Sequence, residues 1–213
     1  MEKSKELKDL QEIKTMMERS SRFLSLSGLS GVSAGIIALV ASLIAFYLLD
    51  FGRIKYDENY FLIRPLIELD YKLNLIPKLF LLAVVTFVMA LTSAIFFSWR
   101  KAKKYNYPVW DHTTKRMLFQ LLIPLITGGF FVLILLSRND GTLLAATTLI
   151  FYGLALVNAG KYTLREVQYL GVLEIILGLL AGIYTSWGLL FWAGGFGVLH
   201  IIYGLVMYYR YER

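Results

Sequence analysis

Two ionisable side chains, Glu174 and His200, interrupt a stretch of apolar sequence. Between Val167 and Tyr209, Glu174 is the only charged residue and His200 the only one that titrates near neutral pH. A charge at the centre of a bilayer costs at least ~2.5–3.5 kcal/mol on insertion scales, so such residues usually face a bundle interior. The pair predicts a proton-responsive or cation-binding site in a cavity. The alternative is a structural hydrogen bond between two helices, with Glu174 reaching toward the membrane interface.

Small residues surround both positions with the same spacing, three residues before and four after. Gly171 and Gly178 flank Glu174, and Gly197 and Gly204 flank His200. Each titratable group therefore shares a helix face with glycines, where a neighbouring helix can approach closely. Ser27, Gly31 and Gly35 predict another such ridge, used either within the monomer or between copies in a homo-oligomer.

The chain that must position these residues has 213 residues, of which 57% are hydrophobic and 17% charged. Soluble domains carry about 25% charged residues, so this composition excludes a disordered chain and an ordinary soluble enzyme. A hydrocarbon core needs ~20 residues of helix, and the apolar runs are continuous instead of alternating, which excludes a barrel. The sequence predicts an all-α polytopic membrane bundle with six transmembrane helices, at about 23–49, 79–99, 117–137, 141–160, 168–186 and 188–209.

The distribution of basic residues predicts the orientation. With the N-terminus inside, 16 of the 22 Lys and Arg residues lie on the inner side, so we expect both termini to be cytoplasmic. Residues 1–22 form the first unit, a charged amphipathic segment, and residues 23–213 form the transmembrane domain. The segment is expected either to lie on the lipid surface or to dock a cytoplasmic or membrane partner.

Signatures of enzymes and cofactor sites are missing from the sequence. It contains no cysteine and no His-Glu-x-x-His, Gly-x-Ser-x-Gly or phosphate-loop motif, and its two histidines are far apart. Asp111 and His112 do not by themselves make a metal site. The basic loop 100–116 is explained by the positive-inside rule, so the net charge of +7 does not predict nucleic-acid binding. We expect no enzymatic activity, no cofactor and no metal, with the lipid bilayer as the main partner.

Three stretches carry a resemblance to a known group of proteins: residues 21–31 (SRFLSLSGLSG), 151–158 (FYGLALVN) and 188–200 (GLLFWAGGFGVLH). They resemble an uncharacterised family of small bacterial six-helix integral membrane proteins. The last hairpin is more loosely similar, in its Gly and Leu spacing, to the acid-resistance-associated membrane family built from repeated hairpins. The first resemblance implies a bacterial cytoplasmic membrane location and brings no activity, so it assigns no functional residue.

Two functional hypotheses follow. The first is a regulatory or structural membrane component that acts through partners, supported by the charged N-terminal segment and the sparse polarity within the membrane. The second is a small-solute or proton-coupled transporter or channel that uses Glu174 and His200. The first is preferred because the second, third and fourth predicted helices contribute no charge to a pathway.

Overall fold

The computed structural model describes residues 26–54, 75–106, 110–138 and 140–213, and every regular element in these ranges is helical. The predicted N-terminal segment 1–22 lies outside them. The elements are α2 (Gly28–Ile54), α4 (Ile76–Tyr105), α5 (His112–Ser137), α6 (Leu144–Ala159), η2 (Gly160–Tyr162), α7 (Arg165–Ile183), η3 (Thr185–Trp187), α8 (Gly188–Trp192), η4 (Ala193–Leu199) and α9 (His200–Tyr211).

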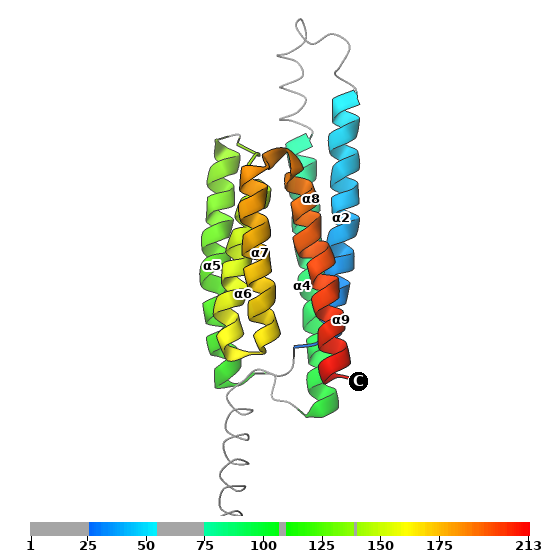
Figure 1. Ribbon diagram of the computed structural model, residues 1–213, viewed down its shortest axis with the longest axis vertical. Coiled ribbons are helices and arrows are strands. Elements are labelled where there is room, and N and C mark those ends of the chain that lie inside the picture. Colours follow the sequence, from blue (N-terminus) through cyan, green and yellow to red (C-terminus); the bar gives the residue numbers. More distant parts are fainter. Residues whose placement is uncertain (1–25, 55–74, 107–109, 139) are drawn as a thin grey trace, which may run out of the picture.

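The predicted six-span, all-α architecture is confirmed within the described residues. Six helical segments are long and apolar enough to cross a membrane. They are Gly28–Leu49, Ile76–Tyr105, His112–Ser137, Leu144–Tyr162, Arg165–Ile183 and Thr185–Tyr211. The beginning of α2 and the end of α9 lie at the same end of the bundle, called here the chain-terminal end (Figure 1).

Two helices extend beyond the apolar stretches that predicted them. Helix α4 continues past residue 99 to Tyr105, because Lys103 and Lys104 in its last turn favour the negative end of the helix dipole. Helix α5 begins at His112 instead of 117, because Asp111 caps it and accepts a hydrogen bond from the Thr114 N–H at 2.7 Å. Capping and dipole effects, which hydropathy does not measure, set both ends.

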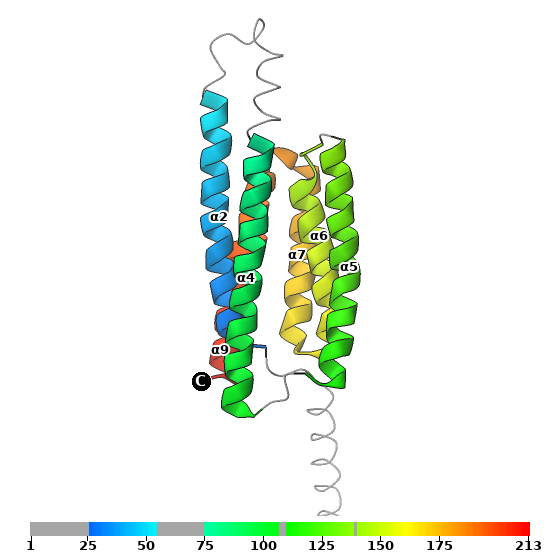
Figure 2. The same ribbon diagram turned by 180° about the vertical axis from the view of Figure 1, so that it is seen from behind.

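The helices form two groups of three. One group consists of α5, α6 and α7, and the other of α2, α4 and the last segment from α8 to α9 (Figures 1 and 2). Contacts of α8 and η4 with α6 and α7 join the two groups. The last transmembrane segment therefore lies at the centre of the bundle and reaches both groups.

Glycines bring α2 and α9 together. A Cβ atom on Gly35 would lie 2.6 Å from the carbonyl oxygen of Gly197, and one on Gly204 would lie 2.6 Å from that of Gly28. Both distances are too short for an alanine, so the two backbones pack at a separation that only glycine permits. At Gly31 the added atom would lie 3.0 Å from the Gly204 Cα. The ridge on α2 therefore packs within the chain.

The helices α6 and α7 also pack closely at glycines. A Cβ on Gly171 would lie 2.7 Å from the Gly153 carbonyl oxygen, and one on Gly153 would lie 2.6 Å from the Gly171 carbonyl oxygen. Two turns further on, a Cβ on Gly178 would lie 2.9 Å from the Ile150 nitrogen. This packing fixes the α7 face that carries Glu174 against α6.

Candidate functional site

Glu174 lies at the middle of α7 and has no exposed surface. Its carboxyl group occupies space that a side chain at position 195 would take, because a Cβ on Gly195 would collide with Glu174 Oε2 and with Leu149. Gly195 belongs to η4, a π-helical turn that contains three of the glycines of the last span. Such turns are frequent at functional sites, and here the turn makes room for a buried carboxyl group.

His200 is the first residue of α9, directly after the π-helical turn, and its ring is held at both nitrogens. Nδ1 lies 3.0 Å from the Gly195 carbonyl oxygen and 3.3 Å from Glu174 Oε1. Nε2 lies 2.8 Å from the Tyr152 hydroxyl, which comes from α6. A carbonyl oxygen only accepts, so Nδ1 carries a proton, and in the neutral ring Nε2 accepts from Tyr152. The structure thus brings Glu174 and His200 together, with Tyr152 as a third member.

Aromatic rings enclose this group. Phe196 stacks on His200 with 5.9 Å between ring centroids, and it packs against Tyr152 and Trp192 at 4.9 Å each. Leu149 is completely buried beside them. The pair therefore lies in a water-poor interior where electrostatic interactions are strong.

The Glu174–His200 pair is most stable when it carries no net charge, with one proton that either group can hold. Neither carboxyl oxygen of Glu174 has a hydrogen-bond partner in the described part of the chain. One proton shared between Glu174 and His200 leaves the site neutral, either as two neutral groups or as an ion pair. Adding or removing a proton places an unbalanced charge in the interior, which is costly. The arrangement can therefore couple proton binding to helix packing.

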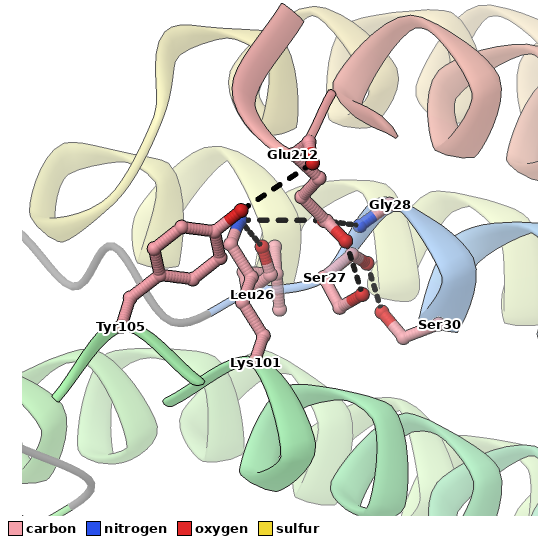
Figure 3. A network of polar contacts seen from close by, with 7 residues as sticks. All are labelled: Leu26, Ser27, Gly28, Ser30, Lys101, Tyr105 and Glu212. Atoms are coloured by element: carbon pink, nitrogen blue, oxygen red, sulfur yellow. Dashed lines mark hydrogen bonds and ion pairs between the residues drawn. The ribbon is translucent and has the colours of Figure 1, made fainter. Parts of the chain in front are cut away.

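A second polar cluster lies at the chain-terminal end and joins three segments (Figure 3). Glu212, after α9, accepts hydrogen bonds from the Gly28 N–H at 2.5 Å and from the Ser27 hydroxyl at 3.1 Å. Lys101 Nζ, from α4, lies 3.3 Å from Glu212 Oε1 and donates to the Leu26 carbonyl at 2.8 Å. The Tyr105 hydroxyl donates to the Glu212 backbone carbonyl at 3.3 Å. We call Ser27, Gly28, Lys101 and Glu212 the terminal lock.

The terminal lock is nearly closed to solvent, since the Lys101 and Glu212 side chains are 5% and 9% exposed. Glu212 completes the first turn of α2, where backbone N–H groups lack helical partners and a negative charge is favourable. The packing prediction for Ser27 did not include this polar role. Sequence reasoning treated Lys101 as one of the basic residues of the loop 100–116 and did not consider Glu212. The two residues lie 111 positions apart in the chain, so no local pattern joins them.

A second ion pair ties α9 to the start of α7 at the same end. Arg210 donates to Glu166 at 2.9 Å, and the Tyr211 hydroxyl donates to the same oxygen at 2.8 Å. The Arg210 side chain is 65% exposed, whereas the Glu166 side chain is 14% exposed. Glu166 therefore lies at the boundary between the packed interior and the surroundings.

Asp111 serves as a helix cap in this structure. Hydrogen bonds from the hydroxyl and the backbone N–H of Thr114 hold the pKa of the Asp111 carboxyl below its usual value of 3.8. Across the described residues, His, Asp and Glu side chains form no group of three that could hold a metal ion.

An apolar groove of about 240 Å³ lies between the two helix groups. Its three hydroxyl groups each donate to a carbonyl four residues earlier in their own helices, which leaves mainly alkyl surface. Trp192 lines this groove and also packs against Phe196, so it lies between the groove and the buried pair. The lining residues are Ala41, Ser42, Ala45, Leu79, Leu82, Ala83, Thr86, Leu144, Ala145, Thr148, Leu189 and Trp192.

Comparisons of this chain with protein-family models, with curated proteins and with solved structures gave no match.

Proposed function

We propose that this protein is a regulatory component of the bacterial inner membrane that acts through partners, and that Glu174 and His200 are its proton-responsive element. The main observation in support of this proposal is the environment of the Glu174 carboxyl group. It has no exposed surface and no hydrogen-bond partner in the described structure, and it lies 3.3 Å from His200 Nδ1. A change in the proton count of this pair creates an unbalanced buried charge. The expected response is a change in the packing of α7 against α9.

The topology supports contact with cytoplasmic partners. Basic residues concentrate on one side of the predicted spans, which favours cytoplasmic termini under the positive-inside rule. Residues 1–22 are then a charged cytoplasmic segment next to α2, and α2 packs directly against the last transmembrane segment that carries His200. A packing change at His200 therefore has a short route through α2 to a partner bound at the N-terminal segment.

A proton-coupled transporter or channel is the second candidate. It is favoured by the same contact between two ionisable groups at membrane depth, since such groups mark ion and proton pathways. The regulatory function is preferred because Leu149, Phe196 and the α6–α7 packing surround the pair with apolar side chains. A transported solute would have to separate these groups at each cycle.

Native mass spectrometry of the protein released from its own membranes in nanodiscs tests the two functions. We expect a stoichiometric second protein, which a variant lacking residues 1–18 no longer retains although its six-helix domain stays folded. We also expect Glu174→Gln to make the amount of retained partner independent of pH.

The transporter predicts a different set of results. The protein would be retained alone or as a homo-oligomer, proteoliposomes would show a pH-dependent flux, and Glu174→Gln would abolish that flux. This combination would overturn the regulatory function. A retained partner that is unaffected both by the deletion and by Glu174→Gln would also contradict it.

A further inference from the structure

We propose that the chain-terminal end of the bundle binds the anionic headgroups of membrane phospholipids, through cations that lie on aromatic rings. The surface consists of the ends of α4 and α9 and the beginning of α5, which lie at the same end of the bundle (Figures 1 and 2). It involves neither Glu174 nor His200 and is therefore independent of the proposed function.

Four cations at this end each lie over an aromatic ring, with 5.1 to 5.9 Å between the charged group and the ring centroid. Two of these pairs lie in the last turns of α4, one at the beginning of α5 and one at the end of α9. The ring quadrupole attracts a cation in this position. We call these four cations and their rings the basic belt. The pairs are Lys103 with Trp99, Lys104 with Tyr105, Lys115 with Trp110, and Arg213 with Tyr209.

The basic belt faces outward at the depth of the membrane interface. Its four cations are all exposed, and the side chains of Trp99 and Trp110 are 52% and 68% exposed. Trp and Tyr side chains concentrate where the apolar core of a bilayer meets the headgroups. Since these rings lie at the ends of three predicted spans, the cations beside them lie at the level of the lipid headgroups. A phospholipid reaches the rings and the cations together, whereas a soluble acidic protein reaches only the cations.

The carboxylates at this end do not neutralise the basic belt. In the described part of the chain they belong to Asp111, Glu166 and Glu212. Asp111 caps α5. Glu166 pairs with Arg210, and Glu212 pairs with Lys101. Within the described residues, no carboxylate lies within ion-pair distance of a lysine of the basic belt. Their charge is therefore available to an anion from outside the chain.

The terminal lock explains how the fold keeps this surface positive. The ring of Tyr105 lies under Lys104, and its hydroxyl donates to the Glu212 carbonyl at 3.3 Å (Figure 3). The Glu212 carboxyl group is nearly buried beside Lys101. The next residue, Arg213, is exposed. The acidic group is thus neutralised inside the bundle, while the neighbouring cations remain outside.

The opposite end of the bundle lacks this arrangement. Among the residues whose side chains are described, the basic ones at that end are Lys78 and Arg138. Trp187 is 61% exposed there, and no described cation lies over its ring. An anionic headgroup is favoured where several unpaired cations lie near the membrane surface. The two ends are therefore expected to select different lipids.

The test is quenching of tryptophan fluorescence by phospholipids with brominated acyl chains in vesicles. Two proteins are compared, one with Trp110 and one with Trp187 as its single tryptophan, and the other tryptophans are replaced by Phe. Brominated phosphatidylglycerol and brominated phosphatidylcholine are titrated separately. The ratio of their binding constants then reports lipid selection near each tryptophan. Circular dichroism checks that both proteins keep the helical content of the wild type.

We expect phosphatidylglycerol to bind about five-fold more strongly than phosphatidylcholine near Trp110, because one cation close to an anionic membrane surface contributes about that factor. Near Trp187 we expect no preference. Lys115→Gln should remove most of the preference near Trp110, and added salt should weaken it by screening. The matched control Lys78→Gln, at the opposite end, should leave it unchanged. Equal affinities at both ends would overturn the proposal, as would a preference that persists in Lys115→Gln and at high salt.

Native mass spectrometry provides a second measurement that needs no tryptophan replacement. The wild type, released from nanodiscs with equal amounts of the two lipids, should retain mainly phosphatidylglycerol. A variant with Lys103→Gln, Lys104→Gln and Lys115→Gln should retain both lipids equally, and equal enrichment in the two proteins would contradict a role for the basic belt. Inorganic phosphate should displace no more phosphatidylglycerol than chloride does at the same ionic strength. Displacement by phosphate, or retention of an acidic protein in place of phosphatidylglycerol, would overturn the assignment to lipid.

Discussion

Glu174 and Glu212 each lie 3.3 Å from a nitrogen that can carry positive charge, yet their surroundings differ. Glu212 faces a lysine and also accepts hydrogen bonds from Gly28 N–H and the Ser27 hydroxyl. Glu174 faces a histidine, and its two oxygens have no hydrogen-bond partner in the described part of the chain. The Glu212 side chain keeps 9% of its surface, whereas that of Glu174 keeps none.

This difference separates a structural carboxylate from the one that we propose binds protons. Three donors around Glu212 stabilise its charged form and connect the beginning of α2 to the end of α4 and to the residues after α9. The site around Glu174 instead contains one imidazole that can itself gain or lose a proton. The number of donors, and not the depth of burial alone, therefore separates the glutamate that fixes the fold from the one that we propose responds to protons.

The largest effect is expected from breaking the terminal lock. Glu212→Ala should lower the free energy of unfolding by about 3 kcal/mol, because it leaves Lys101 buried without its counter-charge and removes the cap of α2. The loss in free energy of unfolding is measured by unfolding the protein in mixed micelles with an increasing fraction of denaturing detergent. The control is Arg210→Ala, which removes an ion pair with a 65% exposed arginine and should cost less than about 1 kcal/mol. Equal losses in the two variants would show that Glu212 has no special role.

A smaller loss is expected from filling the space beside Glu174. Gly195→Ala should destabilise the protein by about 2 kcal/mol, because the added methyl group meets the Glu174 carboxyl and Leu149 in a packed interior. The same substitution at Gly129 on α5, where nothing lies within 4 Å, should stabilise by up to about 1 kcal/mol through helix propensity. If Gly195→Ala is as harmless as Gly129→Ala, the π-helical turn does not define the site.

Asp111 extends the comparison to a partly exposed carboxylate that serves as the N-terminal cap of a helix. Asp111→Ala should cost about 1 kcal/mol at neutral pH, as expected for loss of a helix cap. Because the pKa of Asp111 is lowered, its stabilisation is complete above the usual value of 3.8 and disappears as the pH falls through the lowered value. Asp111→Asn retains the cap and should remove only this acid dependence. Denaturation curves at several acidic pH values measure both effects. Equal stability of Asp111→Ala and Asp111→Asn at every pH would contradict the capping role of Asp111.

The six-helix architecture could be predicted from the sequence because a membrane span depends on local composition. Runs of about 20 uncharged residues predicted all six helices, although several ends differ. Caps and basic residues lengthen α4 and α5, α6 begins at Leu144 instead of 141, and α7 ends at Ile183 instead of 186. The prediction of Glu174 and His200 as candidates also came from local rarity, since a charged residue between apolar neighbours is conspicuous. Their direct contact depends on the pairing of α7 with α9. The shared glycine spacing did not indicate this pairing, because those glycines pack α7 against α6 and the last transmembrane segment against α2.

The remaining polar contacts could not be predicted because they join distant parts of the chain. Lys101 and Glu212 look like ordinary basic and acidic residues at helix ends, and only the fold places them together. Tyr152, which contacts His200, is one of 14 tyrosines, most of which would be expected at membrane interfaces. The π-helical turn at Ala193–Leu199 was likewise hidden, although its cluster of three glycines is a local signal of irregular helix geometry.

The smallest change in stability is expected from Glu174→Gln. This variant tests directly whether Glu174 differs from the structural Glu212. The carboxyl oxygens of Glu174 receive no hydrogen bond in the described structure, so an amide of the same shape should alter the free energy of unfolding by less than about 0.5 kcal/mol. The same variant removes the ionisable carboxyl group from the pair, so it should also remove the part of the pH dependence of stability that the proposed function assigns to the pair. Parallel denaturation curves over pH for Glu174→Gln and Glu212→Gln measure both effects. If Glu174→Gln destabilises as much as Glu212→Gln, then Glu174 is a second structural lock, and its missing hydrogen bonds do not mark a proton-responsive site.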